Sequence, residues 1–325
     1  MFNIVQRRKW FFLFSGIIIV AGLISMGYSI ANYPEHSPIR LGIDFIGGSL
    51  LDFQFTPAPD TKQTGTIDEN TLTATFREFG STDVLIQREG DPSTNQWAIR
   101  TNYLDKAHTD NLEAALTDLA KKDGYQFVVK DINQVSPTVG GEVSRAALVA
   151  VVVASFAVLG WIWFAFRGVP DASRYGVCAV LAMIHDILVM VGVMSLMGLF
   201  FGWEADSLFL TALLTVAGYS VQDTIVVYDR IRENAARHRG EPYEMIINRS
   251  IMETLQRSIS LQLVVAFVLV ALFLMGGASI HQFVGVLLIG LLSGTYSSTF
   301  TAIPLLVAWE EGQFPFAFGR AAARA

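Results

Sequence analysis

The sequence predicts a multi-span α-helical membrane protein that carries one α+β domain outside the membrane. Of its 325 residues, 52% are hydrophobic and only 16% are charged, whereas soluble globular proteins have about 25% charged residues. The charges are concentrated between residues 32 and 142 and in short loops. The remainder forms apolar blocks of about twenty residues or more, which is enough to cross a bilayer.

The first apolar stretch follows a short basic tail and contains no charge from Trp10 to Ala31. A secretory signal peptide is the alternative, because Ser29 and Ala31 on either side of Ile30 form the small-x-small pattern of a cleavage site. A signal core has only about 7–15 apolar residues, however, and this stretch is longer. Residues 1–31 are therefore predicted to form the N-terminal tail and a retained first span.

Residues 32–136 are predicted to form the α+β domain. Alternating apolar residues predict strands near 49–55, 83–88, 96–101 and 125–135, and helical periodicity predicts helices near 66–79 and 109–122. The order βαββαβ is that of a ferredoxin-like fold with an antiparallel sheet. We find no catalytic constellation in this domain and expect no enzyme activity.

Composition and motifs exclude several other function classes. The formal net charge is −6, so we expect no nucleic-acid partner. The glycine-rich segment 42–48 lacks the Gly-Lys-Ser/Thr of a phosphate-binding loop. A single cysteine, Cys178, cannot build a disulfide framework or a metal cluster. We therefore expect no bound cofactor or metal.

Residues 137–325 are predicted to form five further spans, a loop at 229–258 and a C-terminal tail. The apolar stretches lie at 146–166, 175–203, 207–228, 259–280 and 283–309. Arginines cluster in 1–9, 167–174, 229–258 and 310–325, whereas the loops at 200–206 and 276–282 contain no lysine or arginine. The positive-inside rule then predicts a protein of the cytoplasmic membrane with both termini cytoplasmic and residues 32–136 outside.

Two local features within these spans are predicted from residue spacing. Pro242 followed by Ile247, Ile251 and Leu255 predicts a separate amphipathic helix along the membrane surface. Pro304 is expected to kink the far end of the last span.

One carboxylate lies well inside the fourth span. At 1.5 Å per residue, Asp223 is roughly 10 Å from the charged boundary at Arg230. A carboxylate at that depth costs several kcal/mol unless it is protonated, paired or hydrated. The alternative to a functional role is a buried aspartate that only hydrogen-bonds a neighbouring helix. Further intramembrane polar residues are His185, Asp186, Ser220, Gln222 and Thr224.

Three features are predicted to meet in the bundle. They are Asp223, Arg257 at the start of the fifth span, and the His185–Asp186 pair. An acid–base pair at the edge of a hydrophobic bundle is typical of a proton relay. Desolvation raises the pKa of a carboxyl group and a nearby arginine lowers it, so movement of Arg257 would load and unload Asp223. The alternative for Arg257 is an ordinary snorkelling residue at the membrane surface.

Four segments resemble motifs of the SecD/SecF family, in the family's order. They read Gly-Ile-Asp-Phe-Ile-Gly-Gly at 42–48, Val-Ser-Pro-Thr-Val-Gly-Gly-Glu at 135–142, Gly-Tyr-Ser-Val-Gln-Asp-Thr-Ile-Val-Val-Tyr-Asp-Arg-Ile-Arg-Glu-Asn at 218–234 and Gly-Thr-Tyr-Ser-Ser at 294–298. The third is similar to the segment typical of the SecF branch, with Gln222 where the family usually has asparagine. The matching residues are Gly42, Asp44, Phe45, Gly47, Gly48, Pro137, Gly140, Gly218, Tyr219, Asp229 and Arg230.

This resemblance implies half of an RND-type transporter. It implies a subunit that pairs with SecD, works beside a SecY-type channel and uses the proton-motive force to help move an unfolded polypeptide outward. Asp223 and Arg257 are the positions that the resemblance implicates in proton conduction; sodium as the coupling ion stays open. The alternatives are a stand-alone RND-like exporter and a scaffold without proton flux.

One departure from the family pattern concerns the fifth span. The family usually follows the arginine with a hydroxyl-rich run, but here Ser258 and Ser260 are followed by the apolar-rich segment 261–265. A hydroxyl-lined path deeper into that helix is therefore not expected.

Overall fold

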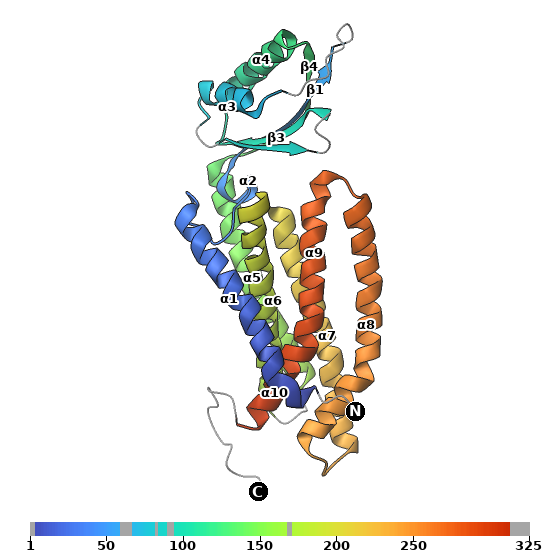
Figure 1. The fold of residues 1–325 in the computed structure, drawn as a ribbon. Coiled ribbons are helices and arrows are strands. Elements are labelled where there is room, and N and C mark those ends of the chain that lie inside the picture. The colour runs from blue at the N-terminus through green and yellow to red at the C-terminus, as the bar shows by residue number, and fades with distance from the viewer. Residues whose placement is uncertain (1–3, 59–66, 82–83, 90–93, 168–170, 313–325) are drawn as a thin grey trace. The chain divides into compact units, whose positions relative to one another are not determined.

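The computed structural model describes residues 4–58, 67–81, 84–89, 94–167 and 171–312. The chain divides into two compact units, one of residues 41–148 and the other of residues 1–40 with 149–325 (Figure 1). Each unit is described by itself below.

The smaller unit contains the predicted βαββαβ order. Its elements are α2 (Ile43–Ile46), β1 (Gly48–Pro57), α3 (Glu69–Glu78), β2 (Leu85–Glu89), β3 (Gln96–Thr101), α4 (Lys106–Lys122) and β4 (Tyr125–Val135). Among the described residues the strands form one antiparallel sheet in the order β2-β3-β1-β4. This is the strand order of a ferredoxin-like fold, so the predicted fold of the domain is confirmed.

The core of this unit forms where α3 and α4 cover one face of the sheet. Leu72 and Phe76 on α3 and Leu112 and Leu116 on α4 are buried, as their helical spacing predicts. They pack with Phe53 of β1, whose alternate residues point to the same face.

The larger unit is a helical bundle (Figure 1). Its long helices are α1 (Arg8–Asn32), α5 (Pro137–Ala165, of which residues 137–148 belong to the smaller unit), α6 (Ala172–Phe201), α7 (Ser207–Arg237), α8 (Tyr243–Met275) and α9 (Ala278–Ser297). The short η1 (Val5–Arg7) precedes α1, and α9 continues through a π-helical turn, Ser298–Ala302, into α10 (Ile303–Glu310). By length and composition, the described part of the chain has six helices able to cross a membrane, as predicted.

The prediction of a separate surface helix after Pro242 is wrong. Residues 243–275 form one continuous helix, so the segment with Ile247 and Ile251 is the first part of α8 rather than an element of its own. Both isoleucines are buried in the bundle core. The hydropathy pattern locates the apolar part of a helix, but the backbone stays helical beyond it because neither Pro nor Gly interrupts residues 243–275.

Just before Pro304, where the sequence predicts a kink, the helix contains a π-helical turn at Ser298–Ala302. Proline has no N–H for the carbonyl four residues earlier and its ring crowds that carbonyl, here Phe300. The wider π turn includes Phe300, and such turns are frequent at functional sites.

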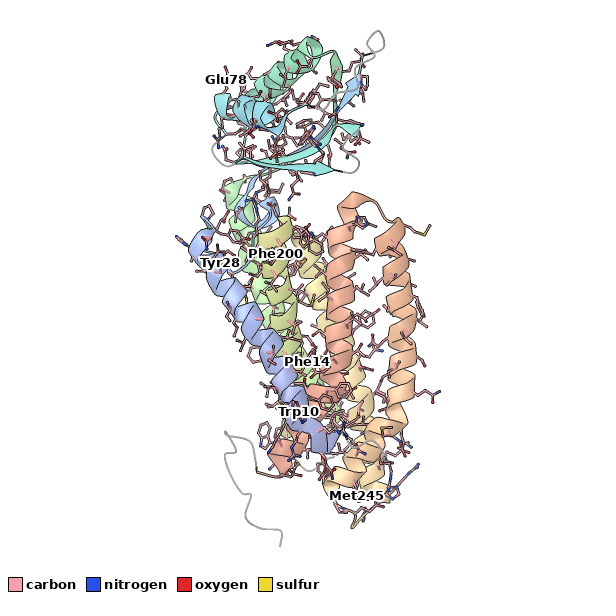
Figure 2. The ribbon with its side chains drawn as sticks, in the orientation of Figure 1. Trp10, Phe14, Tyr28, Glu78, Phe200 and Met245 are labelled. Carbon is pink, nitrogen blue, oxygen red and sulfur yellow. The ribbon has the colours of Figure 1, made fainter. Side chains whose placement is uncertain are left out.

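The first span packs closely against α6. A Cβ on Gly22 would lie 3.0 Å from the Cα of Gly192. One turn and two turns along α1, the hydroxyls of Ser25 and Ser29 lie 2.8 and 2.9 Å from that of Ser195. The other side of α1 is exposed and apolar, as Trp10, Phe14 and Tyr28 show in Figure 2.

Candidate functional site

Asp223 lies on the buried face of α7, with 8% of its surface exposed. Its Oδ1 accepts a hydrogen bond from the Ser258 hydroxyl of α8 at 2.7 Å, and its Oδ2 accepts one from the Ser298 hydroxyl of the π-helical turn at 3.0 Å. The carboxylate therefore joins three elements of the bundle through hydroxyl donors.

Asp186 on α6 is the second buried carboxylate, with 1% of its surface exposed. Its Oδ2 accepts hydrogen bonds from Ser220 at 2.5 Å and Ser297 at 2.6 Å. Its Oδ1 accepts one from Ser293 at 2.7 Å and lies 3.2 Å from Nδ1 of His185. Asp186 thus connects α6 with α7 and α9.

Glycines let these helices approach closely enough for short hydroxyl contacts. A Cβ on Gly294 of α9 would lie 3.2 Å from Cβ of Ser220, and a Cβ on Gly290 would lie 2.5 Å from a methyl group of Val216. Both glycines therefore allow close packing of α9 on α7, as small residues spaced four apart commonly do in membrane helices.

We call Asp186, Asp223 and the serines bonded to them the polar cluster. His185 extends this cluster to α1. Its Nε2 lies 3.1 Å from the Ser15 hydroxyl, which is 3.5 Å from the hydroxyl of Tyr296 on α9. Tyr296 in turn donates to the carbonyl of Phe11 at 2.8 Å. A chain of hydrogen bonds thus runs from α6 through α1 to α9.

The predicted contact between Arg257 and Asp223 is wrong. In the part of the chain that the structure describes, no ion pair joins the two side chains, and Asp223 is bonded by serines instead. Arg257 is exposed at a polar pocket of about 310 Å³ between α7 and α8. The residues lining this pocket are Val226, Asp229, Arg230, Glu233, Glu253, Thr254 and Arg257.

The pocket wall is fixed by a network that sequence reasoning missed. Arg230 donates to Glu253 at 2.6 Å and to Glu233 at 2.5 Å, and Asn234 donates to Glu253 at 2.8 Å. The Arg-Ile-Arg-Glu-Asn segment of α7 is thereby bound to α8 one turn before Arg257. Asp229, the other motif residue, pairs with Arg232 on the same helix at 2.5 Å.

Several predicted residues of the fourth span lie outside the polar cluster. Gly218, Tyr219 and Gln222 are on the exposed face of α7, and Tyr219 is 43% exposed. Thr224 is buried, but its hydroxyl donates to the carbonyl of Ser220 within the same helix. Of the supporting residues predicted there, only Ser220 contacts a carboxylate.

The glycine-rich motif residues meet within the smaller unit. Gly47 has φ +82° and Gly48 has φ +140°, values that favour glycine. A Cβ on Gly47 would lie 2.6 Å from Cα of Pro137, and a Cβ on Gly140 would lie 2.6 Å from the backbone N of Gly47. We call Gly47, Gly48, Pro137 and Gly140 the glycine junction; it joins the α2–β1 turn to the first turn of α5.

The other motif residues of α2 support the same junction. Gly42 is the N-cap of the short helix that contains Asp44 in its first turn. The carbonyl of Phe45 accepts a hydrogen bond from Ser144 of α5 at 2.8 Å.

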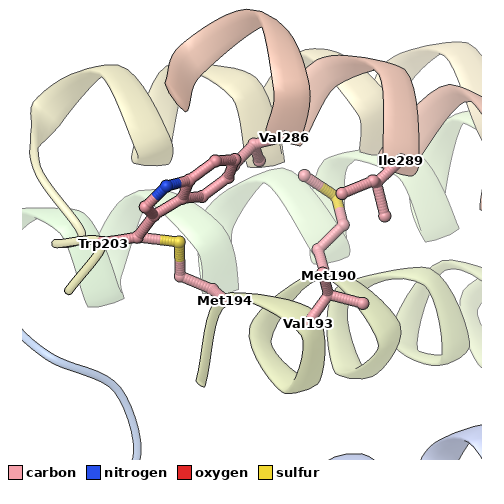
Figure 3. Close-up of a pocket in the computed structure, with 6 residues that line it drawn as sticks. All are labelled: Met190, Val193, Met194, Trp203, Val286 and Ile289. Carbon is pink, nitrogen blue, oxygen red and sulfur yellow. The ribbon is translucent and has the colours of Figure 1, made fainter. Parts of the chain in front are cut away.

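An apolar pocket between α6 and α9 is separate from the polar cluster. Figure 3 shows the side chains that line it: Met190, Val193, Met194, Trp203, Val286 and Ile289. No carboxylate or hydroxyl is among them, so this pocket offers no group for proton chemistry.

The fold and the site together define a class of protein: a polytopic helical membrane protein with a ferredoxin-like domain and buried carboxylates in its bundle. The family described as "Protein export membrane protein SecD/SecF, C-terminal" matches residues 115–312, and the SecD/SecF GG motif matches residues 36–59. The chain therefore belongs to the SecD/SecF family.

Curated relatives cover nearly the whole chain. The protein translocase subunit SecF of Anaerolinea thermophila is 42% identical over 328 residues, which span 99% of this chain and 98% of that protein. The protein translocase subunit SecF of Thermobaculum terrenum is 40% identical over 98% of both chains.

A solved structure gives the same fold. The crystal structure of SecDF, a translocon-associated membrane protein from Thermus thermophilus, superposes with a TM-score of 0.74 at 27% identity. The match covers 95% of this chain but only 39% of the SecDF chain, so the present chain spans well under half of that longer protein.

Proposed function

We propose that this chain is a SecF-type subunit that assists protein export by using the proton-motive force, with Asp223 as the group that binds and releases the proton. The observation that carries this proposal is a buried carboxylate in a membrane-spanning helix that, among the described residues, accepts hydrogen bonds from two hydroxyl groups. An ionised carboxylate has about four acceptor sites, so Asp223 retains capacity for a proton or water.

The polar pocket supports the proposal because it opens close to the segment of α8 that bonds to Asp223. Thr254 and Arg257, which line it, lie one turn and one residue before Ser258, the residue that donates to Asp223. An arginine beside such a pocket favours an ionised carboxylate when it approaches and a protonated one when it withdraws. One proton crossing with the membrane potential supplies about 2.3 kcal/mol per 100 mV, which shifts a conformational equilibrium roughly fifty-fold.

The proposed orientation and location rest on the distribution of charge. Arginines cluster at 1–9, 167–174, 229–258 and 310–325, which supports a cytoplasmic-membrane protein with both termini cytoplasmic and residues 32–136 outside. The proton is the coupling ion in this proposal, and the chain needs no cofactor and performs no enzymatic reaction.

The partners in this proposal are SecD, a SecY-type channel and the exported polypeptide. A SecD partner is supported by the longer SecDF chain, of which this fold matches 39%. It is also supported by the exposed apolar face of α8, where Phe267 is 71% and Val264 is 63% exposed. An apolar face of this kind in a bundle lies against lipid or another membrane helix.

The proposal is tested by removing the titratable group while keeping its shape. Asp223→Asn keeps the size and most hydrogen bonding but cannot bind and release a proton. It should insert and bind its partner normally yet lose the proton-driven part of export in membrane vesicles. Asp223→Glu should retain some activity. Arg257→Lys should lose more than its conserved charge suggests, because lysine lacks the planar fork of arginine.

Asp110→Asn controls for the substitution itself, because Asp110 is an exposed carboxylate on α4 of the smaller unit. Normal proton-driven export in Asp223→Asn, at equal abundance, would favour the scaffold alternative. Ion-dependent current measured for each cation distinguishes protons from sodium. Export of a small molecule by the chain without SecD would favour the stand-alone transporter.

A further inference from the structure

Three consecutive residues at the end of α9 contact three different parts of the bundle. Tyr296 bonds to the carbonyl of Phe11 on α1, Ser297 to Asp186 on α6 and Ser298 to Asp223 on α7. Neighbouring residues on a helix point about 100° apart, so one short segment can contact several helices at once. The π-helical turn begins at the last of the three.

The two carboxylates at this segment differ in how completely they are bonded. Asp186 has four polar groups within 3.2 Å of its two oxygens, from Ser220, Ser293, Ser297 and His185. These fill the roughly four acceptor sites of a carboxylate. Asp223 has two donors and is more exposed. Asp186 is therefore the fixed attachment, and Asp223 is the one with capacity to exchange a proton.

We propose that Asp186 is a positioning residue for Asp223: by holding Ser297, it sets the position of the Ser298 hydroxyl that binds the exchanging carboxylate. This inference rests on the proposed function, in which Asp223 exchanges a proton. Asp186 makes no hydrogen bond to Asp223 among the described residues. In this proposal it acts through the backbone between Ser297 and Ser298, and it also accepts a hydrogen bond from Ser220 on α7, one turn before Asp223.

Ser297 and Ser298 belong to one rigid piece of backbone. Both residues have right-handed helical dihedral angles, and the N–H of Ser298 bonds to the carbonyl of Gly294 as in a regular helix. A displacement of Ser297 therefore carries Ser298 with it, because neighbouring helical residues are fixed about 100° apart. The hydrogen bond from Ser297 to Asp186 holds the last α-helical residue in place at this transition.

Other titratable groups lie on the helices that pack against Asp223. Arg257 of α8 lies one residue before Ser258, which bonds to Asp223. His185 lies beside Asp186 on α6, and Tyr296 of α9 is two residues before Ser298. A test must leave these groups unchanged. Replacing Asp186 itself would alter the buried charge, so serine variants are the better probes.

Ser297→Ala and Ser293→Ala form a matched pair. Each removes one hydroxyl from Asp186 and leaves its charge in place, but only Ser297 is adjacent to the residue that bonds to Asp223. The measurement is the infrared band of the protonated Asp223 carboxyl in the full chain, reconstituted with its partner and followed against pH. The band is assigned by its loss in Asp223→Asn.

Loss of a donor to the ionised carboxylate favours the protonated form. Ser298→Ala should therefore move the pH midpoint of the band upward by about one unit, a tenfold change in proton affinity. Ser297→Ala should move it in the same direction by at least half of that shift, and Ser293→Ala should leave it unchanged.

An unchanged midpoint in Ser297→Ala, or an equal shift in Ser293→Ala, would overturn the positioning role and leave proton exchange at Asp223 intact. A wild-type Asp223 band that does not respond to pH would instead overturn the proposed function, and this inference with it.

Discussion

The glycine junction gives a prediction whose size follows from the structure. Gly140→Ala would place a Cβ 2.6 Å from the backbone N of Gly47, 3.0 Å from the carbonyl carbon of Ile46 and 3.1 Å from that of Phe45. Ordinary van der Waals contact begins near 3.4 Å. All three atoms are backbone, so no side chain can rotate away and the chain itself must shift.

The expected cost combines two opposing effects. Overpacking of a well-packed site costs about 1–3 kcal/mol, and a contact with backbone lies at the upper end of that range. Alanine in place of glycine inside a helix gains about 1 kcal/mol. The net destabilisation of the junction by Gly140→Ala is therefore about 2 kcal/mol. Gly141→Ala is the matched control, because its Cβ would have no atom within 4 Å, and it should gain up to about 1 kcal/mol.

Hydrogen exchange measured by mass spectrometry on the full chain tests this difference locally. A change of 1.4 kcal/mol is a factor of ten in an opening equilibrium, so about 2 kcal/mol corresponds to roughly thirty-fold faster exchange. Peptides covering 42–48 should exchange faster by that factor in Gly140→Ala and no faster in Gly141→Ala. Equal exchange in the two variants would refute the steric reasoning, and so would faster exchange in both.

Three further predictions concern the topology and the domain. A cysteine at Thr94 should react with an impermeant reagent added outside intact cells; reaction only after lysis would reject the outward orientation. Residues 36–134 should fold alone, because Leu72 and Leu112 pack within their own unit; non-cooperative unfolding of the fragment would contradict this. The pKa of the Asp105 carboxyl is held below its usual 3.8, chiefly by the backbone N–H of His108 and then by its ring. The ionised Asp105 carboxyl therefore stabilises the folded domain above pH 3.8, and this stabilisation is lost as the pH falls through the lowered pKa. The advantage of the wild-type fragment over Asp105→Asn, which keeps a capping side chain, should therefore disappear in acid, and a pH-independent difference would argue against it.

The spans and the domain were predictable because their signals are local. An apolar stretch such as 10–31 must be a helix to satisfy its backbone in a membrane, and alternation such as that in 49–55 favours a half-buried strand. Helix ends were less predictable, as the continuous α8 shows. Residues 243–258 are polar enough to lie outside an apolar stretch, yet they pack into the bundle through Ile247 and Ile251.

The candidate site was predictable only in part. Asp223 and Asp186 stand out because a carboxylate is rare in an apolar stretch. The partners of Asp223 could not be predicted in the same way. Ser258 and Ser298 are 35 and 75 residues away in the sequence, and no local pattern distinguishes them from other serines. The one available signal was the run of small and hydroxyl residues at 293–298. It suggests close packing equally well, and only the tertiary arrangement shows that its hydroxyls bind carboxylates.

The hydroxyl-poor segment of the fifth span now has a structural explanation. Leu261, Leu263 and Val264 are 57%, 49% and 63% exposed, so these three side chains face away from the bundle, whereas Val265 packs against α9. Hydroxyls placed there would not reach Asp223. The donors come instead from Ser258, one turn earlier, and from Ser298, the first residue of the π-helical turn after α9. In this chain the polar surroundings of Asp223 are therefore shared between α8 and the π-helical turn, and a proton route need not continue along α8. Ser298→Ala should accordingly impair proton-driven export.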